Sequence, residues 1–145
     1  MQYSLGPYNS AFGFESLYSN STGDRNAAFG MQSLRQNTSG YRNTAIGMYS
    51  YYENTSGAFN TGIGYSAGDY QATGDNCVYV GCDSYGNYAY LNNSVCLGFT
   101  TRGTADNQVR LGNSSITSVG GFVNYTNLSD GRYKKNVRED VSGLD

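Results

Sequence analysis

Carboxylates are the residues of this chain best suited to chemistry, because a pair of them in a cleft can hydrolyse a glycosidic bond. The chain carries eleven Asp and Glu residues and no histidine. The acids are scattered, and Asp69, Asp75 and Asp83 come nearest to a cluster. With no histidine to serve as acid or base, we expect that the chain is not an enzyme. Cleavage of a polysaccharide is the alternative, which digestion of a purified glycan would test.

The cysteines Cys77, Cys82 and Cys96 are an odd set without a Cys-x-x-Cys pair. Together with the lack of histidine, this spacing argues against a zinc site, so no metal and no cofactor are expected. We expect buried free thiols, since free cysteine behaves as a small hydrophobe. A disulfide between chains, or one between Cys77 and Cys96, is the alternative.

Tyrosine offers binding rather than catalysis, because it combines an apolar ring face, which can stack on a sugar, with a polar hydroxyl. The chain has fifteen tyrosines. The candidates for a ligand-facing role are Tyr49, Tyr51 and Tyr52 in one cluster and Tyr85, Tyr88 and Tyr90 in another. The competing interpretation is that these rings pack between subunits.

Low charge and low apolar content exclude several classes of protein. Apolar residues make up 38% and charged residues 14% of the chain, both below the usual globular share. The net charge of −2 gives no basic footprint for nucleic acid. No apolar run reaches the length of a membrane span, and the N-terminus lacks the layout of a signal peptide. We therefore expect no nucleic-acid partner and no membrane insertion, in a chain made and assembled without secretion or in a piece of a longer polypeptide.

The elements that position these side chains follow from an internal repeat of seventeen residues. One glycine column holds Gly13, Gly30, Gly47, Gly64, Gly81 and Gly98, and a second holds Gly6, Gly23, Gly40, Gly57 and Gly74. Such a period marks stacked copies of one small unit, and a solenoid tolerates this composition because each coil needs few inward apolar residues. Disorder, the alternative for a chain rich in Gly, Ser and Asn, is disfavoured by the strict period and the 14% aromatic content.

Strand alternation predicts which columns of the repeat face the interior of a coil. The position before each repeat glycine is large and apolar and is expected to point inward. It holds Phe12, Phe29, Ile46, Ile63, Val80 and Leu97. A neighbouring column of small residues, which holds Ala11, Ala28, Ala45 and Gly62, is expected to face either another subunit or solvent. The repeat glycines should form bends at positive φ, between two short strands in each coil.

The repeat, over residues 1–112, predicts an all-β fold: a parallel β-roll, or β-solenoid, of about seven coils. The seventh copy, residues 107–112, comes fourteen rather than seventeen residues after the sixth. Residues 113–128 alternate in part and are predicted to form an extended β connector. The composition changes again at residue 129, so residues 129–145, which hold both lysines of the chain, are a third module.

Two of the coils share the pattern Asn-x-Val-x-(Val/Leu)-Gly, at residues 76–81 and 93–98. This pattern resembles the head repeats of trimeric autotransporter adhesins of the YadA type, over about residues 6–112. The resemblance implies a left-handed parallel β-roll and a side-by-side homotrimer, and the same repeats occur in phage and viral fibres. The spacing here is longer than the common head repeat, and the first four coils carry Asn one place later than the family pattern.

Residues 129–137, Ser-Asp-Gly-Arg-Tyr-Lys-Lys-Asn-Val, and the Gly-Leu-Asp at 143–145 resemble the start of the intramolecular chaperone domain (peptidase S74 type) of tailspikes and tail fibres. In that family, whose motif is Ser-Asp-x-Arg-x-Lys, the domain assembles trimers of β-rich fibres and then cleaves itself off. The resemblance makes Ser129 the nucleophile and Lys134 its base, with the cut at the Leu128–Ser129 bond. A desolvated lysine can activate a serine hydroxyl in this way. We expect cleavage only in a longer parent chain, because the family domain runs far beyond seventeen residues.

These observations predict a structural and adhesive segment of a homotrimeric phage or viral tail or surface fibre, located in the virion. It would contribute to host attachment through a surface glycan or receptor, and its assembly would depend on the C-terminal chaperone. The alternatives are the head of a bacterial trimeric adhesin at the cell surface and a segment of a polysaccharide-depolymerising tailspike. An ice- or mineral-binding solenoid is a further alternative, although its candidate column of Thr22, Ser39, Ser56 and Thr73 is mixed and ends at Tyr90.

Overall fold

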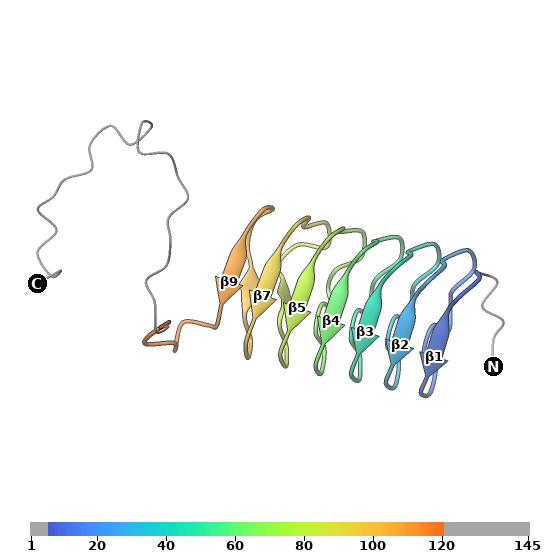
Figure 1. Ribbon diagram of the computed structural model, residues 1–145, viewed down its shortest axis with the longest axis horizontal. Coiled ribbons are helices and arrows are strands. Elements are labelled where there is room, and N and C mark those ends of the chain that lie inside the picture. The colour runs from blue at the N-terminus through green and yellow to red at the C-terminus, as the bar shows by residue number, and fades with distance from the viewer. Residues whose placement is uncertain (1–5, 121–145) are drawn as a thin grey trace, which may run out of the picture.

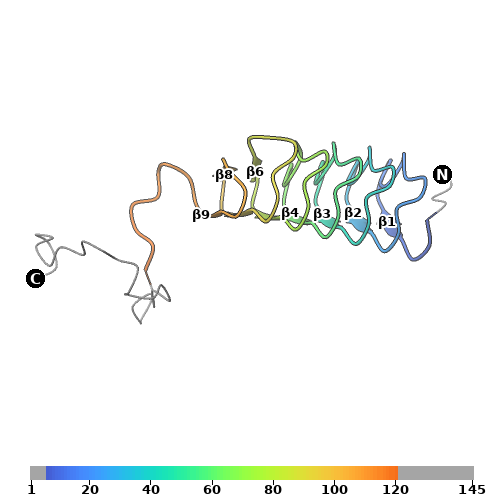
Figure 2. The same ribbon diagram turned by 90° about the horizontal axis from the view of Figure 1, so that it is seen from above.

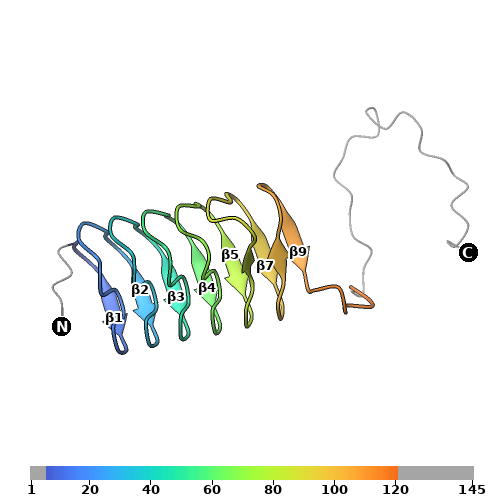
Figure 3. The ribbon, with the colours of Figure 1, turned by 180° about the vertical axis from the view of Figure 1, so that it is seen from behind.

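The structure is a computed structural model that describes residues 6–120, which form a rod of stacked coils (Figure 1). The strands are β1 (Ser10–Phe12), β2 (Ala27–Phe29), β3 (Thr44–Ile46), β4 (Thr61–Ile63), β5 (Val78–Val80), β6 (Tyr85–Gly86), β7 (Val95–Leu97), β8 (Arg102–Gly103) and β9 (Val109–Leu111). Seven of them form one parallel sheet in the order β1-β2-β3-β4-β5-β7-β9, which Figure 3 shows from behind. The expected all-β parallel solenoid is confirmed.

The register of this sheet follows the seventeen-residue repeat. Ala28 pairs with Ala45, seventeen residues later, and the other neighbouring strands keep this offset up to β7. The last pair has the shorter offset that the sequence predicts, because Val95 pairs with Val109. Seven strands enclose about six turns, not the predicted seven, since the seventh copy contributes β9 without a coil after it in the described part of the chain.

The predicted orientation of the strand side chains is wrong by one residue. The small residues point into the coil, where Ala28 and Ala45 are fully buried, so this column faces neither solvent nor another subunit. The large residues point outward, and Phe29 and Ile46 remain 44% and 43% exposed. A period of two fixes which residues share a face of a strand, but a shift of one residue exchanges the two faces. The interior is narrow, and Leu34 from the opposite turn fills the space beside the alanines.

Gly47 shows why glycine recurs at the bend after each strand. Its φ is 130°, a region that side chains avoid, and the six glycines of this column lie between 125° and 140°. A Cβ at Gly47 would also lie 2.3 Å from the carbonyl oxygen of Gly64 in the next coil. The predicted bend at positive φ is confirmed, and the close approach of neighbouring coils is a second reason for glycine.

The second glycine column has a different cause, illustrated by Gly40. A Cβ at Gly40 would lie 2.3 Å from Oδ1 of Asn37 and 2.5 Å from the carbonyl oxygen of Gly57. These glycines are therefore required by close packing between coils, whereas the sequence had predicted a bend at positive φ.

A buried ladder of asparagine side chains runs along the interior of the first four coils, at Asn9, Asn26, Asn43 and Asn60. Asn43 illustrates each rung. Its Nδ2 donates to the carbonyl oxygen of Gly57 at 2.8 Å, and its Oδ1 accepts from the backbone N–H of Asn60 at 2.9 Å. Each side chain thus supplies the hydrogen-bond partners that two buried backbone groups need.

A second ladder consists of Asn20, Asn37 and Asn54, all buried. Asn37 Nδ2 donates to Asn20 Oδ1 at 2.8 Å, and Asn54 Nδ2 donates to Asn37 Oδ1 at 2.7 Å. All three lie in Asn-x-Ser/Thr sequons. Their burial in the interior explains these sequons as structural positions of the repeat.

In the fifth and sixth coils the asparagine of the repeat stands one place earlier than in the first four coils. A different residue then occupies the ladder position, and the register of the sheet is unchanged. Cys77 takes the place of the next ladder asparagine. Its backbone N–H donates to Oδ1 of Asn60 at 2.9 Å, and its thiol donates to the carbonyl oxygen of Leu91 at 3.1 Å. Asn76 and Asn93 lie one residue earlier, at positive φ of 58° and 50°. Asparagine tolerates this left-handed conformation better than most residues, which is a local reason for its presence there.

The change from small residues to Tyr79 along the interior column is compensated by neighbouring residues. The ring of Tyr51 fills the space above two glycines, because a Cβ at Gly62 or at Gly68 would lie 2.6 Å from that ring. The Tyr51 and Tyr79 rings pack at 6.0 Å between centroids. Large and small residues therefore alternate along the interior so that its volume stays filled.

The second sheet is restricted to one pair of strands. β6 and β8 pair in parallel, on the wall across the coil from the main sheet (Figure 2). In the other coils this wall is formed by turns, so the second strand predicted for every coil is present in two of them. Residues 113–120 contain no strand, and the remainder of the predicted connector lies outside the described residues.

Candidate functional site

The outward face of the main sheet carries a continuous apolar stripe. The apolar stripe consists of Phe12, Phe29, Ile46, Ile63, Val80, Leu97 and Leu111 before the bends, and Phe14, Met31, Met48, Tyr65, Cys82 and Phe99 after them. All except Val80 and Cys82 keep more than a third of their surface exposed, and none is charged. With coils about 4.8 Å apart, the stripe extends over roughly 29 Å. Exposed apolar patches of this extent mark interaction surfaces in soluble proteins.

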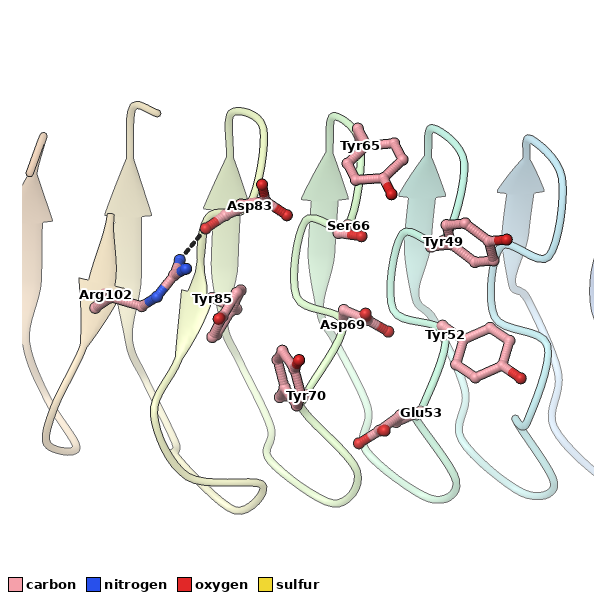
Figure 4. Close-up of a pocket in the computed structure, with 10 residues that line it drawn as sticks. All are labelled: Tyr49, Tyr52, Glu53, Tyr65, Ser66, Asp69, Tyr70, Asp83, Tyr85 and Arg102. Atoms are coloured by element: carbon pink, nitrogen blue, oxygen red, sulfur yellow. Dashed lines mark hydrogen bonds between the residues drawn. The ribbon is translucent and has the colours of Figure 1, made fainter. Parts of the chain in front are cut away.

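A second candidate surface is a groove of about 590 Å³ that lies across the turns of several coils. The tyrosine groove is lined by Tyr49, Tyr52, Glu53, Tyr65, Ser66, Asp69, Tyr70, Asp83, Tyr85 and Arg102 (Figure 4). Tyr65 belongs to both surfaces, so the groove borders the apolar stripe.

Two groups of rings form the walls of the tyrosine groove. Tyr49 packs edge to face against Tyr52 at 5.7 Å and against Tyr65 at 6.0 Å. Across the groove, Tyr70 and Tyr85 pack at 4.6 Å between centroids. These mutual contacts restrict the rings before any ligand binds, which lowers the entropy cost of binding.

An arginine over a tyrosine ring holds each end of the groove. At one end Arg35 lies 5.8 Å from the ring centroid of Tyr52, and its Nε donates to Glu15 at 2.7 Å. At the other end the Arg102 guanidinium lies 3.5 Å over the ring of Tyr85. Its Nη1 also donates to the backbone carbonyl oxygen of Asp83, as the dashed line in Figure 4 shows.

Asp69 lies between the two walls and is the most perturbed acid of the described chain (Figure 4). Its Oδ1 is inaccessible to solvent and accepts no hydrogen bond. Burial, reinforced by the nearby carboxylates of Glu53 and Asp83, raises the pKa of Asp69 to about 6. Besides Asp69, Glu53 and Asp83, the charged side chain that lines the groove is that of Arg102. A buried acceptor without a partner is rare in a folded protein and calls for a functional explanation.

We expect Asp69→Asn to stabilise the fold at neutral pH. The pKa of Asp69 in the folded state is about 6, above its ordinary 3.8, so the folded state loses stability as the pH rises through this window. The amide removes that loss. After allowance for solvent screening of this partly exposed group, we expect the free energy of unfolding to rise by about 1 kcal/mol at pH 7. Urea unfolding at about pH 7 and about pH 3 measures it, since the gain should vanish below the ordinary pKa of 3.8. An equal gain at both pH values would contradict the assignment.

The predicted ligand-facing tyrosines divide into three groups in the structure. Tyr49, Tyr52 and Tyr85 line the tyrosine groove. Tyr88 and Tyr90 stack on each other at 5.7 Å and are exposed, but they lie outside the groove. The prediction for Tyr51 is wrong. This residue is fully buried, and burial raises its pKa well above the usual range.

Sequence reasoning missed half of the groove. Glu53, Tyr65, Tyr70 and Arg102 line it with the residues named above, and the available signal was their spacing by about seventeen residues. Asp69 and Asp83 of the expected acidic cluster lie in the groove. Asp75 does not, since its Oδ1 accepts from the backbone N–H of Ala58 at 2.7 Å.

The remaining candidates have no binding geometry in the described chain. Cys77 and Cys96 are buried free thiols, as predicted, and burial raises their pKa values. Within residues 6–120, no three acidic or cysteine side chains lie together as metal ligands, and this part also contains no helix that could span a membrane. Ser129 and Lys134 lie outside the described residues.

Comparison with known proteins adds no relative. No family model, no curated protein and no solved structure matches this chain.

Proposed function

We propose that this chain is a structural and adhesive segment of a homotrimeric fibre, of the kind found in phage or viral tails, that attaches to a glycan on a host surface. The observation that carries the proposal is the apolar stripe. It runs along the whole rod, is uncharged, and faces away from a core that is already filled by Ala28, Ala45 and Tyr51. The interior therefore does not need these large side chains, and a surface that can bury them is another protein.

Further copies of the same chain are the occupants that best fit the stripe. Parallel copies placed side by side bring each coil to the height of the same coil in its neighbours, so Ile46 meets Ile46 along a shared axis. Depletion of charge and enrichment in Phe and Met are typical of the buried centre of a protein interface. The resemblance of the repeats to trimeric adhesin heads favours three copies over two.

We expect charge in the stripe to dissociate the assembly. The double variant Ile46→Asp, Ile63→Asp places two carboxylates in the centre of the stripe, where burial without a partner costs several kcal/mol each. Light scattering coupled to size exclusion should give a particle mass three times that of one chain for the native protein, and the mass of a single chain for this variant. The control Ser39→Asp, Ser56→Asp adds the same charge at exposed turn positions and should remain trimeric.

Cys82 provides an independent readout of the same arrangement. It is the one cysteine of the stripe, whereas Cys77 and Cys96 are buried. In a parallel assembly the Cys82 side chains of neighbouring copies lie at one height, so a short bismaleimide should join two chains through this residue. A native chain that stays monomeric over a range of concentrations, or that is not joined at Cys82, would argue against the proposal.

Hydrolysis of a polysaccharide is a second candidate function, favoured by one observation. Asp69, with a pKa of about 6, lies in the same groove as Glu53 and Asp83, and a glycosidase uses one protonated and one ionised carboxyl group. Shortening of an amino polysaccharide by the native chain, but not by the Asp69→Asn variant, would support it. An unchanged polymer would leave binding as the role of the groove.

A further inference from the structure

We infer that the tyrosine groove binds a saccharide that carries free amino groups. This inference deepens the proposed function, because it assigns the attachment site and the chemical class of its ligand. It does not depend on the number of chains in the assembly, since every lining residue except Tyr65 lies outside the apolar stripe.

The shape of the surface fits a short sugar chain rather than a single sugar. The groove of about 590 Å³ adjoins a second hollow of about 370 Å³, and Glu53, Tyr70 and Tyr85 line both. The two hollows are open to solvent, so a polymer can lie in them without threading an end. Tyr70, which is 48% exposed, stands where they meet and can support a sugar ring, whereas the Arg102 guanidinium covers a face of Tyr85.

The charge of the groove selects the class of sugar. Three carboxylates, from Glu53, Asp69 and Asp83, face one guanidinium, and neither Glu53 nor Asp69 forms an ion pair within residues 6–120. The Arg102 guanidinium is already engaged by the Tyr85 ring and the Asp83 carbonyl oxygen. The groove is therefore negative, attracts an ammonium group and repels the carboxylates of acidic sugars.

The aromatic walls add to this preference. An ammonium group over a tyrosine face is attracted by the ring, and the attraction grows as the group is desolvated. Tyr49, Tyr52 and Tyr70 lie around the space in front of Asp69, so a cation there meets aromatic rings and carboxylates together (Figure 4). A neutral sugar would gain the stacking contacts but not the cation–π and ionic contacts.

Asp69 gives a thermodynamic reason for a positive ligand. At neutral pH its carboxylate is ionised although burial and two neighbouring acids disfavour the charge. A bound ammonium group compensates that charge, so part of the stability that the empty groove loses is recovered in the complex. A site that destabilises the free protein in this way is typical of binding surfaces.

The inference can be tested with three defined oligosaccharides and the full chain. A glucosamine oligomer carries free amines, an N-acetylglucosamine oligomer is neutral, and a galacturonic acid oligomer is acidic. Calorimetric or NMR titration at about pH 6.5, where a large share of both Asp69 and the sugar amines is charged, should show at least about tenfold tighter binding of the first than of the second. The acidic oligomer should not bind. Equal binding of the amino and neutral oligomers, tighter binding of the acidic one, or no binding at all would overturn the inference.

Matched variants locate the binding in the groove. Tyr70→Ala removes a ring that is 48% exposed, and Glu53→Gln removes one charge without changing the shape of the side chain. Each should weaken binding of the glucosamine oligomer about tenfold. The controls Tyr41→Ala and Asp24→Asn remove a ring and a charge outside the groove and should bind normally. Equal loss in the controls and the groove variants would overturn the assignment to this site.

Light scattering on the same samples separates this inference from the proposed function. A trimer that does not bind the glucosamine oligomer overturns the assignment of the groove and leaves the fibre assembly intact. A monomer that binds it supports the groove and overturns the assembly.

Discussion

Gly47→Ala is expected to prevent the rod from folding stably, although it adds only one methyl group. The new Cβ would lie 2.3 Å from the carbonyl oxygen and 2.7 Å from the carbonyl carbon of Gly64, and both belong to the backbone of the next coil. The φ of 130° at Gly47 is strained for any residue with a side chain. We expect a loss of at least about 3 kcal/mol in the free energy of unfolding, measured by chemical denaturation at fixed protein concentration.

The control for this experiment is Ser39→Ala, at an exposed turn position that has no such close contact with the next coil. It should change the free energy of unfolding by less than about 0.5 kcal/mol. Near-native stability of Gly47→Ala would show that neighbouring coils can separate at the bend, which the close contacts along this column oppose.

Asn43→Ala is the second substitution with a large expected effect. It removes the acceptor of the buried backbone N–H of Asn60 and the donor to the carbonyl oxygen of Gly57, bonds of 2.9 and 2.8 Å. Each buried polar group left without a partner costs about 1–3 kcal/mol, so we expect a loss of about 3 kcal/mol in the free energy of unfolding. Chemical denaturation at fixed protein concentration measures it, since assembly would otherwise shift the transition.

Asn92→Ala is a matched control for the asparagine ladder. The Asn92 side chain also accepts a backbone N–H seventeen residues away, that of Asp75 at 2.9 Å, but it is exposed to solvent. Water can replace these bonds, so we expect a loss below about 1 kcal/mol. Similar losses at Asn43 and Asn92 would show that burial does not decide the cost.

The register of the solenoid could be predicted because the repeat is nearly exact. The columns that fall in the strands, such as Ala28 with Ala45 and Ile46 with Ile63, are pairs of neighbours in the sheet. The bends at the first glycine column were equally visible, since few other residues tolerate their φ values.

The orientation of the strands could not be predicted from the same columns. Both columns are apolar, and the rule that large residues lie inside fails where a coil is too narrow for them. Ala45 fits between the walls, while Ile46 is placed outside, where an assembled neighbour can cover it. Alternation determines which residues share a face of a strand, and only the width of the coil determines which face lies inside.

The groove could be predicted only in part, because its residues come from turns with unusual backbone angles. Tyr49 and Tyr51 both have positive φ, 60° and 49°, yet one lines the groove and the other fills the core. No pattern of period two or 3.6 describes such a turn, so sequence alone could not separate Tyr51 from Tyr49 and Tyr52. The space left by Gly62 and Gly68 decided the position of Tyr51.

The asparagine ladders also have a mechanical consequence. The hydrogen bonds between coils run along the long axis of the rod, so tension applied at its two ends loads the rungs in series. In such an arrangement the weakest rung sets the force at which the rod opens. The first ladder gives way to Cys77 in the fifth coil, where a thiol instead of an amide bonds to the sixth coil, at the carbonyl oxygen of Leu91. The boundary between the fifth and sixth coils is therefore where a stretched rod would yield first.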